Sequence, residues 1–526
     1  MKSAPFVYES VVNELYLRTS EGWLALRLDN PTRIYPYMRL LGCLASIATR
    51  AAHGLPRATV VVLLASLGLL AVSRQCQAKE PQAIRCAFLD FVKDPFYNSE
   101  EESVRFVRDG LLVVEDGKIK DFGRYDDLKA KYADIGTVSY PDRLAMPGFI
   151  DCHTHFPQTR VVAAYGNQLL EWLTTSIFPE ELKFNDPAYA REVASFFLDE
   201  MLRRGTTTVL TYTTTFPGSV DVFFEEASKR NMRVIAGLTG IDRKGFAPDS
   251  YIDTADSFYR DSKALYHKWH GKGRNLYAVT PRFAYGCTDE MLKRVGELYK
   301  ELPGVYMNTH LSENRSEIAG VKERFPEAAN YLDVFGRVGV VGPRCVFGHS
   351  IHLGESEFKR LSDSGASIAF CPSSNMFLGS GLFKIAEAKS PKTPIRVGMG
   401  ADIGAGDNFG ILGTLKDAYK VGMLQDYRLS AFKSLYLGTR GSAEALYLDD
   451  KLGTFDPGKE ADFVVIDLMA TPTLAARNQS PQIGSLDELA YKTFGLIMLA
   501  EDRAIAATYV AGKKLYTRNP WVETAR

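Results

Sequence analysis

The chain has 526 residues, of which 46% are hydrophobic and 24% charged, values typical of a soluble globular protein. Its 63 basic and 63 acidic side chains give a formal net charge of zero, which argues against binding to a phosphate backbone, so we expect no nucleic-acid partner. The seven cysteines include no Cys-x-x-Cys pair. This usage indicates a reducing compartment, and we expect a cytoplasmic location.

Residues 1–80 differ from the rest of the chain. No acidic residue lies between Asp29 and Glu80, and Val60–Val72 is an uncharged, mostly apolar run. The run is shorter than the roughly 20 residues that span a membrane, and it begins later than a signal-peptide core usually does. Three interpretations stay open: a targeting leader or signal anchor, a disordered extension, or an over-extended gene model. We expect membrane association only if this segment is real and retained.

Residues 82–147 contain short strand-like runs separated by turns, with a hairpin signal at Asp116-Gly117. Residues 452–518 return to turns and strands, and Ala504–Val510 with Lys513–Tyr516 has the pattern of a hairpin. We therefore predict one small β-sandwich domain, built from 82–147 and 452–518 and interrupted by a central domain. The four strands expected in its first part are Cys86–Phe91, Gly110–Glu115, Lys118–Phe122 and Thr137–Tyr140.

Residues 148–450 alternate strand-like runs with helix-like segments, as parallel strands with helical crossovers do. Eight such units predict an α/β fold, a (β/α)8 TIM barrel. A doubly wound open sheet is the alternative, but no Gly-x-Gly-x-x-Gly follows the first strand. The expected strands are Gly148–His153, Thr207–Tyr212, Arg233–Leu238, Asn275–Thr280, Val305–His310, Arg344–Phe347, Ser367–Phe370 and Ile395–Gly400. The first expected helix, Tyr189–Arg204, has apolar residues at Val193, Phe196, Phe197 and Met201.

Five of the eight histidines fall at or just past the ends of these strands, where a barrel builds its active site. Of the other three, His53 lies in the leader, and we expect His267 and His270 to be solvated. The five are His153, His155, His310, His349 and His352, and Asp402 ends the eighth strand in the same way.

The types of these residues point to a metal site. His153 and His155 stand at i and i+2 of a strand, so both imidazoles face one side. With His310 and Asp402 they offer three nitrogen atoms and one oxygen atom to Zn²⁺, which lowers the pKa of a bound water to about 7. Asp402 can serve both as ligand and as the base that takes a proton from the water.

Three further residues stand near the ends of these strands. Glu313, three residues after His310, can reach the same pocket as a proton shuttle, or can instead favour a helix dipole. His349 either orients the water or is a hydrogen-bonded core histidine. We expect His352 to be structural.

Several motifs in order resemble the amidohydrolase superfamily over about residues 86–518. They are Pro147–His155, His310, His349, Gly400–Asp402 and Leu452–Asp462. A narrower set is similar to the branch of that superfamily that deaminates guanine. It consists of Leu169–Leu173, Phe178–Glu180, Thr280–Phe283, His310–Arg315 and Cys371–Asn375.

The resemblance implies hydrolysis of guanine to xanthine and ammonia, with one zinc ion per subunit and a homodimer. Strand four ends Val279–Phe283 without the lysine that bridges two metals in other members, which also indicates a single zinc. The implied zinc ligands are His153, His155, His310 and Asp402. The implied substrate-binding residues are His155, Gln158, Arg282, Phe283, His310, Glu313 and Asp402. The implied catalytic residues are Glu313, Asp402 and His349, with Glu313 protonating the ring nitrogen next to C2.

Two departures bear on specificity: Ser373 stands where many members have threonine, and Met376-Phe377 is bulkier than expected. The same machinery could act on another ring, such as an adenosine derivative, cytosine or a triazine. An alternative of another class is a catalytically silent barrel that serves as a scaffold.

Overall fold

The computed structural model describes residues 81–166, 168–499 and 502–518, together with the backbone of three short strands nearer the start of the chain. It divides into two compact units, Met1–Lys79 and Glu80–Arg526. In the first unit β1 (Ser10–Val11), β2 (Glu14–Thr19) and β3 (Gly22–Arg27) form an antiparallel sheet in that order. The apolar run 60–72 lies outside the described residues, so its three interpretations stay open.

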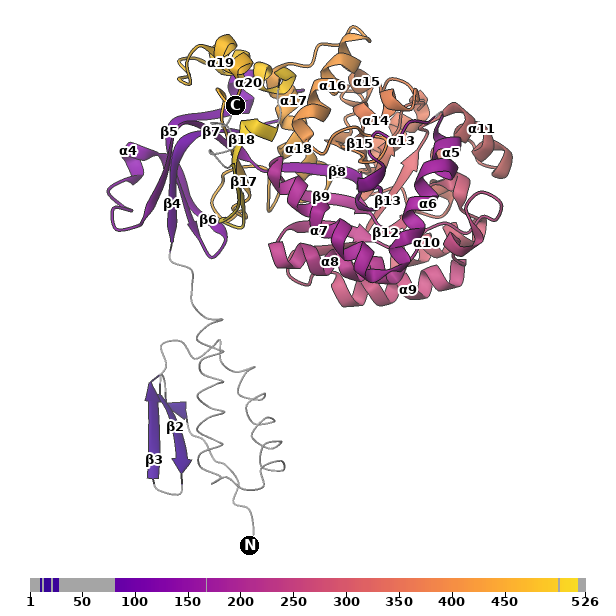
Figure 1. Ribbon diagram of the computed structural model, residues 1–526, viewed down its shortest axis with the longest axis horizontal. Helices are drawn as coiled ribbons and strands as arrows, with labels where there is room; N and C mark the ends of the chain where they lie inside the picture. The colour runs from indigo at the N-terminus through magenta and orange to yellow at the C-terminus, as the bar shows by residue number, and fades with distance from the viewer. Residues whose placement is uncertain are drawn as a thin grey trace. The chain divides into compact units, whose positions relative to one another are not determined.

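Eight parallel strands form the barrel at the centre of the second unit (Figure 1). The order β16-β15-β14-β13-β12-β10-β9-β8 follows the chain, and the short β11 (Thr239–Gly240) also pairs with β12. The barrel closes between its first and last strands, where the Asp402 amide, just after β16, donates to the His153 carbonyl of β8 at 2.9 Å. The predicted (β/α)8 fold is confirmed. The strands are β8 (Phe149–His155), β9 (Thr206–Tyr212), β10 (Arg233–Gly237), β12 (Asn275–Pro281), β13 (Tyr306–Leu311), β14 (Cys345–His349), β15 (Ser367–Phe370) and β16 (Arg396–Met399).

The strands are buried on both faces, which is why they lack the alternation of a half-exposed sheet. Every residue of β8 and of β9 is buried. Inward-facing side chains such as Ile150, Leu210 and Ile235 form one apolar cluster, while the outward-facing ones pack with the helices in a second. The barrel interior is therefore a packed core, and only the carboxyl ends of the strands are free to build a site.

Helices follow the strands as expected and surround the barrel (Figure 1). The buried stripe of α7 runs through Val193, Phe197 and Met201, while Phe196 is 54% exposed. No described helix is long and apolar enough to cross a membrane. The main helices are α7 (Pro187–Arg203), α8 (Pro217–Arg230), α9 (Ala255–Trp269), α10 (Asp289–Glu301), α11 (Arg315–Arg324), α12 (Tyr331–Arg337), α13 (Glu355–Ser364), α14 (Pro372–Phe377), α16 (Ile411–Met423), α17 (Ala431–Gly438) and α18 (Arg440–Ala445).

A seven-stranded sheet unites the segments before and after the barrel, in the order β19-β18-β17-β7-β4-β5-β6. The two segments meet where β17 pairs antiparallel with β7, with Phe463 opposite Pro147. One residue, Gly148, separates this sheet from β8, and a Cβ there would stand 2.2 Å from Thr207 Oγ1. The strands are β4 (Gln82–Phe91), β5 (Val104–Glu115), β6 (Lys118–Arg124), β7 (Thr137–Pro147), β17 (Phe463–Ile466), β18 (Ile505–Val510) and β19 (Lys513–Thr517).

The strand-rich pattern at the end of the chain is interrupted by two helices that the sequence did not predict. They are α19 (Pro472–Asn478) and α20 (Leu486–Leu499). The last two strands form the predicted antiparallel hairpin.

Candidate active site

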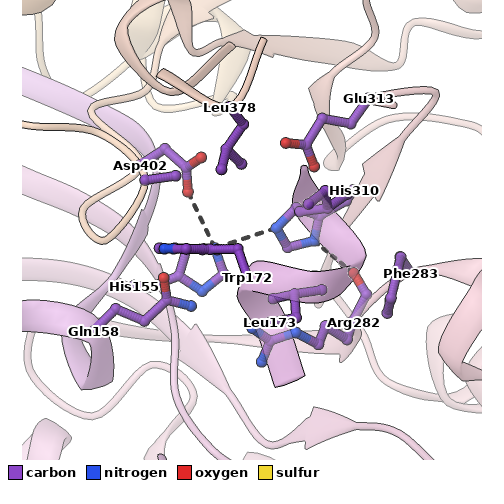
Figure 2. A pocket seen from close by; sticks show the side chains of 12 residues that line it. His155, Gln158, Trp172, Leu173, Arg282, Phe283, His310, Glu313, Leu378 and Asp402 are labelled. Atoms are coloured by element: carbon purple, nitrogen blue, oxygen red, sulfur yellow. Dashed lines mark hydrogen bonds and ion pairs between the residues drawn. The ribbon is translucent and has the colours of Figure 1, made fainter. Parts of the chain in front are cut away.

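Four histidines and one aspartate converge at the carboxyl ends of the barrel strands. His153 and His155 come from β8, His310 from β13, His349 from the end of β14, and Asp402 from just beyond β16. Asp402 Oδ1 lies 3.4 Å from His153 Nε2 and 3.2 Å from His155 Nε2. His155 Nε2 is also 3.2 Å from His310 Nε2 (Figure 2). His349 and Asp402 have φ of +63° and +50°, a conformation that residues other than glycine seldom adopt and that is concentrated at functional sites.

The donor atoms of this cluster fit a metal ion. Atoms of His153, His310, His349 and Asp402 all lie within 4.8 Å of one another, and His155 adjoins the same atoms. Both ring nitrogens of His153 and Nε2 of His349 are buried without a hydrogen-bond partner. Buried polar atoms of this kind need a partner that the protein itself does not supply. The structure thus brings together the four predicted ligands and adds His349 beside them.

The protonation states suit metal binding. Burial lowers the pKa of His155 to about 4 and also lowers the pKa values of His153 and His310. Burial opposes ionisation of Asp402, but the adjoining rings of His153 and His155 outweigh it and hold the pKa of that carboxyl well below its usual value. Neutral imidazoles and an ionised carboxylate are the forms that coordinate a cation.

Hydrogen bonds on the far side of two rings decide which nitrogen faces the cluster. His310 Nδ1 lies 2.6 Å from the Arg282 carbonyl, and His349 Nδ1 lies 2.8 Å from Asn375 Oδ1. The Nδ1 atom of each ring faces an oxygen acceptor, so Nε2 is the ring nitrogen turned toward the cluster. His349 Nε2 stands 3.8 Å from Asp402 Oδ2.

Glu313 reaches the same space from the loop after β13. It is buried, and its Oε2 lies 3.6 Å from His349 Nε2. Burial, reinforced by the charge of Asp402, raises the pKa of Glu313 well above its ordinary value. The carboxylate that caps α11 is instead Glu317, whose Oε2 accepts the amides of Glu313 and Asn314 at 3.1 and 3.2 Å. Glu317, not Glu313, is therefore the carboxylate that favours the helix dipole. Glu313 faces the cluster instead, where burial disfavours its ionised form.

A pocket of about 360 Å³ opens beside these residues (Figure 2). Its polar lining consists of His155, Gln158, Arg282, His310, Glu313 and Asp402, and its apolar lining of Leu169, Trp172, Leu173, Phe283, Leu378 and Ala405. All seven residues expected to bind substrate are among them.

Apart from Phe283, the apolar walls were not assigned from the sequence. Leu169, Trp172 and Leu173 lie on consecutive helical turns, α5 (Leu169–Trp172) and η3 (Leu173–Ile177), which follow the η2 turn (Phe156–Val161) that carries Gln158. Neighbouring polar residues were also missed. Glu181, at the end of α6 (Phe178–Glu181), accepts hydrogen bonds from Gln158, Arg282 and Tyr251. In the sequence Glu181 looks like one of two acids in the first turn of a helix, so no local signal marks it as buried.

The remaining histidines lie outside the cluster. His352 Nε2 is 2.8 Å from the Ser380 carbonyl, which agrees with a structural role, and His267 is exposed. The expectation for His270 is wrong: its Nδ1 accepts the Tyr277 amide at 3.0 Å, and its ring stacks on Tyr266.

The residues that depart from the family pattern do not line the pocket. Ser373 donates to Asp417 Oδ2 on α16 at 2.8 Å. Neither Met376 nor Phe377 is part of the pocket lining.

Gly404 lies directly against Gln158. Its φ is +123°, and a Cβ there would stand 2.0 Å from Gln158 Oε1. We expect Gly404→Ala to raise the Michaelis constant for the substrate by displacing that amide, and to destabilise the fold by ~1 kcal/mol. Steady-state kinetics and thermal unfolding measure the two effects. Gly458→Ala is the control, because Gly458 also has a positive φ (+93°) but has nothing within 4 Å. An unchanged Michaelis constant in Gly404→Ala would contradict the placement of Gln158.

The amidohydrolase family model matches residues 144–515. The guanine deaminase of Escherichia coli is 47% identical over 441 residues, which cover 83% of this chain and 98% of that protein. A crystal structure of guanine deaminase from Bradyrhizobium japonicum superimposes with a TM-score of 0.81 at 45% identity, covering 84% of this chain and all of that one. The structure of guanine deaminase from C. acetobutylicum with bound guanine in the active site has a TM-score of 0.73 at 25% identity, covering 83% of this chain and all of that one.

Proposed function

Because the chain belongs to the amidohydrolase family, we propose that it hydrolyses guanine to xanthine and ammonia. The observation that carries the proposal is the pocket in which Gln158, Arg282 and Glu313 face the cluster of histidines and Asp402. Guanine deaminases of E. coli and B. japonicum, similar over more than four-fifths of this chain, support the same activity.

The proposed cofactor is one zinc ion per subunit, held by His153, His155, His310 and Asp402. Three nitrogen atoms and one oxygen atom form a donor set that zinc accepts readily. When bound, zinc supplies a Lewis acid that makes water a better nucleophile near neutral pH.

The chain's own residues divide the proton transfers between them. Asp402 is ionised and accepts the proton of the attacking water. Glu313, kept protonated by burial, donates to the ring nitrogen next to C2 and so favours attack at that carbon. His349 lies within 4 Å of both carboxyl groups and positions the water between them. The proton taken by Asp402 then leaves with the amino group as ammonia. The remaining proton of the water passes from the new C2 hydroxyl to Glu313 as C2 becomes a carbonyl, which restores both carboxyl groups.

The pocket matches a flat, neutral purine in shape and polarity. Phe283 and Trp172 form apolar walls against which a ring can stack, while Gln158 and Arg282 can form hydrogen bonds with its polar edge. Glu313 lies beside His310, which is one of the proposed metal ligands (Figure 2). We propose these residues, with His155 and Asp402, as the substrate contacts.

The direct test is conversion of guanine to xanthine, followed by ultraviolet absorbance and by ammonia release. We expect turnover that is lost when a chelator removes the metal and restored by about one equivalent of zinc per chain. Adenosine derivatives, cytosine and triazines, assayed in parallel, test the alternative substrates. Turnover that prefers one of these rings would contradict the substrate. A zinc-loaded protein inert toward every ring would instead support the scaffold interpretation. The presence of all four proposed ligands argues against that interpretation.

Three further statements belong to the proposal. The domain division is 82–147 plus 452–518 for the β-domain and 148–450 for the barrel, with residues 1–80 as an extension. The enzyme is a homodimer that acts in guanine catabolism. Its compartment is the cytoplasm, as its cysteine usage indicates.

A further inference from the structure

Glu181 is a buried carboxylate that ties together polar groups from three other segments of the chain. Its side chain is 0% exposed. Oε1 accepts a hydrogen bond from Gln158 Nε2 at 3.0 Å, and Oε2 accepts one from Arg282 Nη1 at 2.7 Å and another from the Tyr251 hydroxyl. We propose that Glu181 is the positioning residue that sets the hydrogen-bonding pattern which the pocket offers to the purine. This inference rests on the proposed function.

The contact with Gln158 decides which end of its amide faces the substrate. Glu181 Oε1 accepts from Gln158 Nε2, so the amide turns its NH2 group toward Glu181 and its oxygen away from it. Gln158 lines the pocket, and its oxygen therefore serves as an acceptor there. Guanine carries donors at N1 and at its 2-amino group, and an acceptor complements them.

The contact with Arg282 supplies both charge balance and orientation. The Arg282 side chain is 2% exposed, and a buried cation without a counter-charge is strongly unfavourable. The guanidinium is a planar fork, so fixing Nη1 also fixes the directions of its other N–H groups. The Phe178 ring, 5.5 Å from Arg282 Cζ, supports the same orientation. Arg282 thus presents donors to an oxo group while the pair as a whole stays neutral, as suits an uncharged purine.

Glu181 acts through its neighbours, because it is not among the described residues that line the pocket. Its carboxylate is also engaged on both oxygen atoms. These contacts predict an effect on substrate binding and none on proton transfer at Glu313 or Asp402.

The main experiment uses Glu181→Gln in the full-length, zinc-loaded enzyme. A glutamine has one acceptor oxygen and one NH2 group, so it cannot accept from both Gln158 and Arg282. We expect the Michaelis constant for guanine to rise by about 10- to 100-fold, with kcat within about threefold of wild type and an unchanged pH profile. Glu226→Gln is the matched control, because Glu226 is also a buried carboxylate paired with arginines, but on α8. That variant should keep the wild-type Michaelis constant.

A double-mutant cycle shows whether the effect passes through Arg282. In an Arg282→Met background, Glu181→Gln should add little to the Michaelis constant, because the contact is already lost. The double variant should also unfold at a higher temperature than Arg282→Met alone, since it no longer buries an unpaired carboxylate. If Glu181→Gln does not fold, Tyr251→Phe removes one donor to the same carboxylate and should raise the Michaelis constant by a smaller factor.

Two results would overturn the inference while the proposed function stands. The first is a Michaelis constant for guanine that stays at the wild-type value in Glu181→Gln, or in Tyr251→Phe if only that variant folds. The second is a variant that loses kcat alone and keeps its Michaelis constant. If wild-type enzyme converts no guanine to xanthine, the proposed function fails instead. The thermal cycle, which needs no turnover, still reports whether Glu181 and Arg282 are coupled; additive shifts in unfolding temperature would refute that coupling.

Discussion

Glu313→Gln is expected to lower kcat for guanine by about 10²–10⁴-fold, because an amide cannot deliver a proton to the ring nitrogen. The substitution keeps the size of the side chain and removes a carboxyl group whose ionisation burial already disfavours. Glu313 is not a proposed ligand, so the zinc content should stay at one per chain and the unfolding temperature should not fall. Steady-state kinetics, elemental analysis and calorimetry measure the three quantities.

Glu357→Gln is the control for that experiment. Glu357 is also a buried glutamate of the barrel, and it accepts the Gly354 amide at 2.9 Å at the start of α13, outside the pocket lining. The Glu357→Gln variant should turn over guanine at the wild-type rate. Near-normal kcat in Glu313→Gln would remove Glu313 from the proposed proton transfer.

Asp402→Asn is expected to lose both the metal and turnover. The change removes the anion that adjoins His153 and His155 and also the acceptor for the water's proton. Loss of a general base costs about 10²–10⁴-fold, and the weakened metal site adds to it, so we expect activity to fall by more than about 10³-fold. Zinc bound after dialysis should fall well below one equivalent per chain.

The control for Asp402→Asn lies in the same loop. Asp407 is exposed, and its Oδ1 accepts only a local hydrogen bond from Asn408 among the contacts of the described residues. Asp407→Asn should keep its zinc and its activity. A variant Asp402→Asn that retained full zinc would show that the histidines alone hold the metal. Comparison with Glu313→Gln separates the two roles, since only the aspartate change should cost zinc.

The barrel could be predicted from sequence because its signal is local. Each strand is a short apolar run bounded by polar or glycine residues, and the run of strands and helices admits few arrangements. Which apolar side chains of α7 are buried is not a local signal of this kind. Phe196 follows Val193 by three residues and lies at the edge of the buried stripe, where periodicity cannot decide exposure.

The histidines and Asp402 could also be identified from sequence. They stand at strand ends, and the closed geometry of a parallel barrel brings such ends to one rim. Their residue types then point to metal chemistry without any knowledge of distances. The two helices α19 and α20 were missed because they interrupt a strand-rich segment and contribute nothing to that rim.

What the sequence determined by itself was therefore the barrel, the order of its strands and the set of side chains that we propose as metal ligands. These depend on short-range sequence patterns and on the rule that the carboxyl ends of parallel barrel strands meet on one face. Only the tertiary structure showed what holds Gln158 and Arg282 in place, since Glu181 and Tyr251, which join them, come from other segments with no common pattern. A buried carboxylate acquires its role from the donors that surround it, and in Glu181 those donors lie up to 101 residues away in the chain.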